Sequence, residues 1–186
     1  CGDGFCSGNE TNASCPQDCP VCVNVPPMGR TIGDTDLCAE KAGDPQYWYA
    51  GNGGHDGSYV WTHAVDAAMP DNYVTWKATF DEAGDYDVDV FVEPGSAGSK
   101  QAKYVVTHAG TTSEKTVDQS VSGGWTSLGT FAFVQGGAQS VRLNDNTGEA
   151  FSLKRALVFD AVRFTRIGGN PMGSSSSSSG SGGSGS

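Results

Sequence analysis

The stretch YVVTHAGTTSEKTVDQSVSGGWTSLGTFAF, residues 104–133, contains three runs that are typical of β-strands. Residues 104–107 are β-branched and aromatic, residues 115–121 alternate weakly, and residues 125–133 alternate clearly between apolar and polar side chains. Glycines separate the runs, and no window shows apolar residues at helical spacing. We therefore predict two antiparallel hairpins. Because an isolated hairpin is unstable in water, a second sheet must cover them.

Residues 72–93 predict two more strands, joined by the turn DEAGD. Their alternation assigns one apolar face to each strand, while aspartates point away from the core in the second strand. The residues predicted to face the core are Val74, Trp76, Ala78, Phe80, Tyr86, Val88, Val90 and Val92. Residues 157–165 predict one final strand, with Asp160 in the same phase as Val158, Val162 and Phe164.

Composition limits the classes of partner. The chain has 186 residues and 27 glycines, and its net charge is −10, which repels phosphate backbones and anionic lipid surfaces. No apolar run approaches the ~20 residues that a membrane helix needs.

We predict four segments: a cysteine-rich module (1–20), a connector pinned by a disulfide (21–43), one domain (44–168) and a Gly/Ser-rich disordered linker (169–186).

The six cysteines form an even set near the N-terminus, which favours disulfides and an oxidising compartment. Zinc is the alternative, but the C-x2-C spacing occurs once, at Cys19 and Cys22. Four cysteines in the first module allow three pairings. We favour the interleaved one, and we pair the remaining two across the connector. The expected bridges are Cys1–Cys15, Cys6–Cys19 and Cys22–Cys38.

Oxygen-bearing side chains are also concentrated in the first module, namely Asp3, Asn9, Glu10 and Asp18. Carboxylate and amide oxygens at close spacing suit a hard cation such as Ca²⁺. The alternative is turn chemistry, in which Asp and Asn side chains bond to nearby backbone. Calcium is therefore a candidate cofactor, and no other cofactor is expected.

Residues 44–64 contain five aromatic side chains around a glycine-rich turn, GNGGHDG. Aromatic faces stack on the C–H face of sugar rings, so Tyr47, Trp48, Tyr49 and Tyr59 are candidate glycan-binding residues. The alternative places Tyr49 and Trp61 in the core, because a sandwich needs aromatic bulk to close.

The ordered segments VTHAG, GGWTSLGTFAF, SVRL and VFDAVRF resemble the golvesin C-terminal-like domain, which also occurs as the carbohydrate-binding domain of xanthan lyases. The resemblance spans residues 44–167. It implies a non-catalytic antiparallel β-sandwich, jelly-roll or galactose-binding-like, attached to secreted bacterial proteins. The segment CGDGxCxxxExxxxCxxDC also resembles a short cysteine-rich repeat of secreted bacterial proteins. The overall fold class expected is all-β, with a small disulfide-rich module at the N-terminus.

Catalytic motifs are missing: the sequence contains no GxSxG and no HExxH. We assign His108 and Asp160 structural roles, with His108 or a tryptophan indole as the donor that a buried Asp160 requires. Trp125, at the opening of a strand, is expected to be mainly structural as well.

The sequence therefore predicts a secreted or cell-surface accessory module that is not itself an enzyme. It would bind polysaccharide or cell-envelope glycan and target an attached hydrolase or surface protein, without nucleic acid or membrane insertion. The first alternative is a structural spacer or self-assembling surface subunit, and the second is a hydrolase.

Overall fold

The computed structural model describes residues 13–15, 17–18 and 21–167. Almost all of its regular structure is extended, and the named strands pair antiparallel throughout. The strands are β1 (Gly29–Ile32), β2 (Ala39–Ala42), β3 (Tyr49–Asn52), β4 (Ser58–His63), β5 (Tyr73–Phe80), β6 (Gly84–Val92), β7 (Ala102–His108), β8 (Thr111–Val117), β9 (Gly124–Phe133), β10 (Gly136–Asn144), β11 (Ala156–Phe159) and β12 (Val162–Ile167). Two short 3-10 helices, η1 (Pro45–Tyr47) and η2 (Phe151–Leu153), lie in loops.

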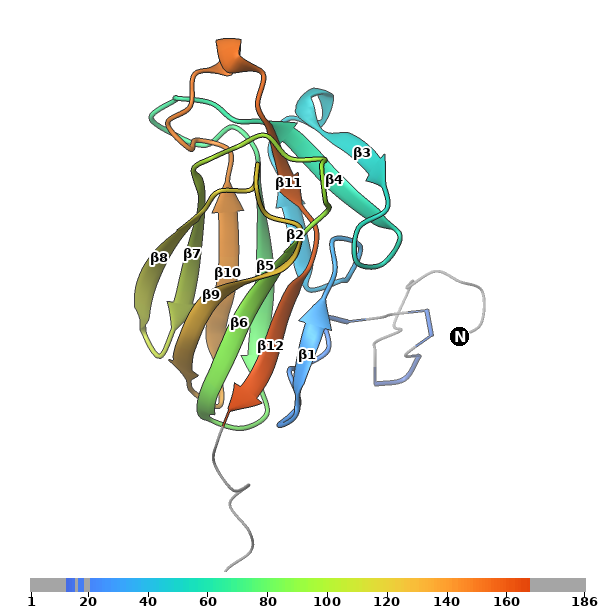
Figure 1. Cartoon of the computed structure of the whole chain (residues 1–186). Coiled ribbons are helices and arrows are strands. Elements are labelled where there is room, and N and C mark those ends of the chain that lie inside the picture. Colours follow the sequence, from blue (N-terminus) through green and yellow to red (C-terminus); the bar gives the residue numbers. More distant parts are fainter. Residues whose placement is uncertain (1–12, 16, 19–20, 168–186) are drawn as a thin grey trace, which may run out of the picture.

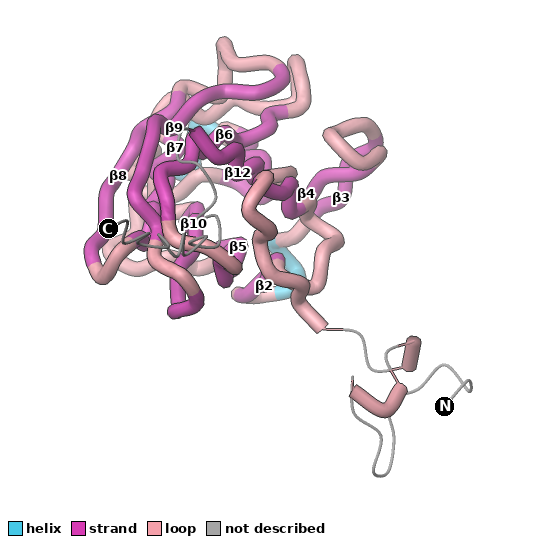
Figure 2. Tube along the Cα trace, turned by 90° about the horizontal axis from the view of Figure 1, so that it is seen from below, coloured by secondary structure: helices cyan, strands magenta, loops and turns pink. Residues whose placement is uncertain are grey.

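Two sheets form a sandwich, which confirms the predicted fold class (Figure 1). One sheet has the strand order β1-β12-β6-β9, and the other has the order β2-β5-β10-β7-β8. Figure 2 shows the layers from below, with the strands of the five-stranded sheet following one another around one side of the molecule. The apolar core lies between the sheets, where stacked and edge-on rings of Phe80, Tyr86, Phe133 and Phe164 meet.

Strands β5 and β6 show why this sequence forms a sandwich. Every residue predicted to face the core in these strands is buried, while the alternate positions lie at the surface or partly exposed. Because side chains alternate across a strand, one face of each strand is apolar and the other is in contact with solvent. The hydrophobic effect therefore fixes which face turns inward.

A third, small sheet has the order β11-β4-β3 and lies beside one end of the sandwich (Figure 1). The sequence predicted a single strand over residues 157–165, and this prediction is wrong. The chain breaks at Asp160 and Ala161, so that β11 pairs with β4 whereas β12 pairs with β6 and β1. All residues from Leu157 to Val162 are buried, so alternation gave no sign of the break.

Two other predicted segments differ from the structure. The strand predicted at residues 115–121 is β8, which begins and ends earlier, and Val121 is 82% exposed. Of the two hairpins predicted in residues 104–133, β7–β8 is present, but the second is wrong, because β8 and β9 lie in different sheets and β9 pairs with β6. The segment 21–43, predicted as a connector, supplies β1 to one sheet and β2 to the other, and places Val25 and Ile32 in the core. Both strands are short edge strands, whose pairing partners lie far away in sequence and leave little local signal.

Trp125 is not a core residue, although the sequence favoured a structural role for it. It pairs in register with Phe91 on the outer face of the four-stranded sheet and is half-buried. The Arg163 guanidinium carbon lies 4.2 Å from its ring centroid, and the centroid of the His55 ring lies 5.0 Å away.

The predicted bridge between Cys22 and Cys38 is present, with a Cα–Cα distance of 4.6 Å. It ties the segment before β1 to the start of β2. Cys15 is also disulfide-bonded. The predicted pairings of Cys1, Cys6 and Cys19 lie outside the described residues.

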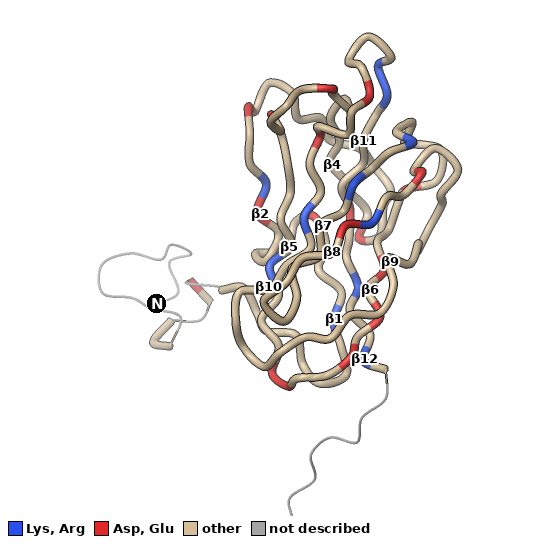
Figure 3. Tube along the Cα trace, turned by 90° about the vertical axis from the view of Figure 1, so that its left-hand side faces the viewer, with Lys and Arg blue, Asp and Glu red and all other residues tan. Residues whose placement is uncertain are grey.

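Acidic and basic residues are dispersed over the sandwich rather than gathered over one sheet (Figure 3). In the described part of the chain, no helix has the length and apolar character needed to cross a bilayer.

Trp76→Ala is expected to lower the free energy of unfolding by about 3–5 kcal/mol, because this fully buried side chain would leave a cavity. Trp125→Ala should cost clearly less, since Trp125 lies on the outer face. Denaturant unfolding of both variants measures the difference, with Val121→Ala as a control for an exposed position. Equal losses for the two tryptophans would contradict the assignment of inner and outer faces.

Candidate functional site

The β3–β4 hairpin presents an aromatic face. Because the strands pair in register, Tyr49 lies opposite Trp61, and their rings stack with centroids 4.3 Å apart and planes 23° apart. The next pair along this face is Gly51 and Tyr59. A side chain at Gly51 would meet the Tyr59 ring, since a Cβ there would lie 2.1 Å from Cζ of the tyrosine. Glycine therefore lets the tyrosine ring lie against the hairpin.

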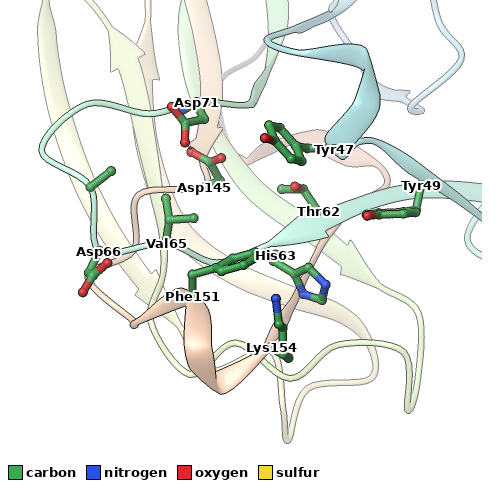
Figure 4. A pocket seen from close by; sticks show the side chains of 11 residues that line it. Tyr47, Tyr49, Thr62, His63, Val65, Asp66, Asp71, Asp145, Phe151 and Lys154 are labelled. Atoms are coloured by element: carbon green, nitrogen blue, oxygen red, sulfur yellow. Dashed lines mark hydrogen bonds between the residues drawn. The ribbon is translucent and has the colours of Figure 1, made fainter.

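A pocket of about 430 Å³ opens at the end of this hairpin, beside η2 (Figure 4). Its walls come from four parts of the chain: η1 and the start of β3, the end of β4 with the loop after it, the end of β10, and η2 with the residue that follows it. The lining residues are Tyr47, Tyr49, Thr62, His63, Val65, Asp66, Ala67, Asp71, Asp145, Phe151 and Lys154. The volume lies within the usual range of ligand pockets, about 300–1,000 Å³.

Three aromatic rings in this lining remain open to solvent. Tyr47 is 45% exposed, Tyr49 41% and Phe151 46%. Large apolar side chains at the surface of a concave site have not been desolvated by the fold itself. They are therefore the part of the pocket that a ligand would cover.

A buried carboxylate holds the loop on one side of the pocket. The side chain of Asp145 accepts hydrogen bonds from the backbone N–H groups of Asp71 (3.0 Å) and Asn72 (2.9 Å). Its own carbonyl accepts one from the N–H of Val65. Burial raises the pKa of Asp145 to about 6, although the backbone donors of Asn72 and Asp71 oppose that shift. Asp145 thus positions both ends of the loop between β4 and β5.

A second buried carboxylate holds the loop that carries η2. Glu149 accepts hydrogen bonds from Ser99 Oγ, from the backbone N–H of Lys100 and from Thr147 Oγ1, and it forms an ion pair with Arg155. Burial acts to raise its pKa, but these donors outweigh burial and the pKa is lowered. The loop on both sides of η2 is therefore fixed to the sandwich.

Lys154 ends this loop in a left-handed backbone conformation, with φ of 51°. A non-glycine residue rarely adopts this conformation, which carries a cost in strain. It places Lys154 Nζ 3.3 Å from the centroid of the Phe151 ring. The ammonium group therefore lies against one aromatic wall of the pocket.

The predicted glycan-binding residues divide into two groups. Tyr47 and Tyr49 line the pocket, whereas Trp48 and Tyr59 do not. Trp48 packs against the core, with its ring centroid 5.0 Å from that of the fully buried Phe159. The alternative that placed Tyr49 and Trp61 in the core is wrong, because Val60 is the residue of β4 that packs against the core.

The sequence did not single out His63, Phe151 or Lys154 as site residues. His63 continues the alternation of Tyr59 and Trp61 along β4, and this pattern was the available signal. Phe151 and Lys154 lie in an irregular loop, where no periodicity distinguishes them. Asp145 belongs to the Asn-Asp-Asn run at the end of β10 and serves there as a loop anchor.

His108 and Asp160 do not meet. His108 ends β7, where Nδ1 lies 3.2 Å from the carbonyl oxygen of Ala132 and Nε2 lies 3.0 Å from Ser113 Oγ. It therefore links β7 to β9 of the other sheet. The prediction that His108 or an indole serves Asp160 is wrong, since the donor is the backbone N–H of His55, at 3.1 and 3.2 Å from the two carboxylate oxygens.

Asp160 lies beneath the turn between β3 and β4 and is only 2% exposed. Burial raises its pKa to about 7, the His55 N–H lowers it, and three neighbouring carboxylates raise it again. These are Asp34, Glu93 and Asp56. Glu93 accepts the next N–H of the same turn, from Gly54, at 2.8 Å. Two carboxylates thus hold this turn through its backbone.

Of the predicted calcium ligands, Asp3, Asn9 and Glu10 lie outside the described residues. Asp18 is described and is 7% exposed. Within residues 13–15, 17–18 and 21–167, no three His, Cys, Asp or Glu side chains are grouped so as to hold a metal ion. The calcium site stays a prediction.

The sequence profile of the golvesin C-terminal domain matches residues 39–166. The chain belongs to this family. The match begins at the first residue of β2 and includes the whole pocket, so the pocket is part of the golvesin C-terminal domain itself. No protein with curated function matches the chain.

Solved structures are similar to this chain at low sequence identity. A Paenibacillus xanthan lyase superposes with a TM-score of 0.61 at 22% identity, over 76% of this chain and 13% of the lyase. A Podospora anserina GH26-CBM35 β-(1,4)-mannanase gives 0.51 at 14% identity, over 78% of this chain and 29% of the mannanase. A family 35 carbohydrate-binding module from Clostridium thermocellum gives 0.47 at 12% identity, over 73% of this chain and 98% of the module. This chain therefore spans only a small part of each of the two enzymes.

The melting temperature is expected to fall as the pH rises from about 5 to about 7, above the range in which the lowered pKa of Glu149 has the opposite effect. Asp160 is a carboxyl whose folded-state pKa, about 7, is raised above its ordinary value of 3.8, so the folded protein binds the proton more tightly than the unfolded chain. This contribution is fully present below pH 3.8 and is lost as the pH rises through 7; Asp145 adds a smaller effect of the same sign up to pH 6.

Thermal unfolding of Asp160→Asn across this pH range tests the assignment. The variant should show a flatter pH profile and a higher melting temperature than the wild type at pH 8, because no charge is buried. Asp85→Asn, at an exposed position of β6, is the control. An Asp160→Asn profile parallel to that of the wild type would refute the role of Asp160.

Proposed function

We propose that this golvesin C-terminal domain is a non-catalytic accessory module that binds polysaccharide, and that the pocket beside η2 is its binding site. The observation that carries the proposal is the set of three solvent-open rings, Tyr47, Tyr49 and Phe151, around a single concave site. The fold holds these rings in place without covering them.

The chemistry of the lining matches a sugar. The apolar C–H face of a sugar ring packs on aromatic side chains, and its hydroxyl groups need donors and acceptors around the rim. Asp66, Asp71 and Lys154 supply such groups, and all three line the pocket. The carboxylates and the ammonium group can form charge-assisted hydrogen bonds with hydroxyls, which are stronger than neutral ones.

The similar structures support the same conclusion. A xanthan lyase and a β-(1,4)-mannanase both carry a domain of this fold, and in each the domain is a minor part of a larger enzyme. An accessory domain that holds the polysaccharide near a catalytic domain is consistent with this arrangement. Function cannot be carried over from fold alone, so the pocket remains the primary support.

We further propose that the module acts outside the cell, in a secreted or cell-surface bacterial protein. The Cys22–Cys38 disulfide and the disulfide-bonded Cys15 support an oxidising compartment. Bound calcium in the N-terminal module belongs to the same proposal and would be tested by melting in chelator and in added Ca²⁺.

Binding should be measured by calorimetry and affinity electrophoresis on xanthan, β-1,4-mannan, β-1,3-galactan and dextran. At least one polysaccharide should bind, and Tyr49→Ala and Phe151→Ala should each weaken binding roughly 2- to 10-fold, the effect expected from losing one aromatic contact. Thermal melting should stay close to the wild type, because both side chains are exposed.

Tyr73→Ala is the matched control, since Tyr73 is an aromatic residue of β5 outside the pocket, covered by the Arg142 guanidinium at 3.7 Å. It should leave binding unchanged. The proposal fails if no glycan in the panel binds, or if Tyr73→Ala weakens binding as much as the two pocket variants do.

A further inference from the structure

The ring of His63 stands at a steep angle to two other rings of the pocket. The planes of His63 and Phe151 meet at 81°, with ring centroids 5.5 Å apart, and those of Tyr49 and His63 meet at 62°. The near-parallel pair is Tyr49 and Trp61, in which one ring covers the other. His63 is therefore not coplanar with Tyr49 or Phe151, and the rings do not form one flat surface.

Polar groups stand beside these rings. Figure 4 shows Asp71 and Asp145 together near Tyr47, whereas Lys154 lies by His63 and Phe151. Each group is on a loop or short helix that the structure fixes: Asp145 by two backbone donors, and the loop of Phe151 through Glu149. The pocket is thus bounded by ordered chain.

The shape restricts the kind of glycan that can bind. A long stretch of polysaccharide lying on a protein needs rings facing the same way along its path, because successive sugars then find successive aromatic faces. A pocket of about 430 Å³, in which His63 stands at 62° to Tyr49 and at 81° to Phe151, offers room for only a small ligand, in the lower part of the range of ligand pockets.

We propose that the pocket recognises the end of a glycan chain, or a short side branch, rather than an internal stretch of a polysaccharide or the flat surface of an insoluble one. The inference rests on the proposed function and narrows its ligand to terminal sugar units. In this mode Phe151 and Tyr49 stack on the terminal unit, while Lys154 and Asp71 bond to its hydroxyls.

The first test is the dependence of affinity on chain length. Manno-oligosaccharides and galacto-oligosaccharides, from the disaccharide to the hexasaccharide, are titrated into the full chain by calorimetry. For the series that binds, all members should have affinities within about twofold of the disaccharide. Affinity that climbs tenfold or more from disaccharide to hexasaccharide would overturn the inference.

The second test counts sites on the polymer. β-1,4-Mannan and β-1,3-galactan are cut partially with endo-acting enzymes, so that mass stays constant while the number of chain ends rises. The binding capacity per gram should rise in proportion to the chain ends. A capacity that stays constant shows internal binding and overturns the inference while leaving the proposed function intact.

Phe151→Ala tests whether the terminal sugar unit binds in the pocket beside η2. It should weaken binding to the cut polymer and to the disaccharide by the same factor, whereas Val121→Ala should change neither. If the variant binds the disaccharide as the wild type does, the terminal unit does not sit in this pocket. If no mannan, galactan, xanthan or dextran preparation binds the wild type, cut or intact, the proposed function fails and this inference with it.

Discussion

The hydrogen bond from the backbone N–H of His55 to the buried carboxylate of Asp160 joins the small sheet to the sandwich. Asp160 stands at the break where the last segment of the chain leaves the small sheet and enters the four-stranded one. Its carboxylate, with Glu93, fixes the turn of the β3–β4 hairpin. At the other end of this hairpin, Tyr49 and His63 line the pocket. A buried charge is costly, so its placement here trades stability for a defined position of the turn.

The sequence was most informative where one face of a strand is buried and the other exposed. In β5 and β6 strict alternation identified each inward residue. In β9 a β-bulge interrupts the alternation, so that Leu128 and Phe131, three residues apart, are both buried. It was least informative for β11, which is buried on both faces, and for the edge strands β1 and β2, whose pairing is decided at long range. The position of Trp125 could not be predicted for the same reason, because its exposure depends on whether it lies on the inner or the outer face of the four-stranded sheet.

The pocket could be predicted only in part. Tyr47 and Tyr49 were recognised from their density in a glycine-rich segment, but adjacent aromatics in an extended chain face opposite ways, and so Trp48 turns to the core. Phe151 and Lys154 are brought to the site by a loop that depends on Glu149, which pairs with Arg155 in the same loop and accepts a hydrogen bond from Ser99, 50 residues away in sequence. No local pattern encodes a contact of that kind. Binding residues commonly lie on such loops because a rigid scaffold positions them.

The contact between Gly51 and Tyr59 has an evolutionary consequence. Gly51 is required by the ring beside it rather than by its own backbone, because any Cβ would overlap the tyrosine. A Cβ at this position and the Tyr59 ring in its present place cannot occupy the same space. Where a member of the family carries a side chain at the position of Gly51, the aromatic ring opposite must have turned away from the hairpin or have been replaced by a smaller side chain.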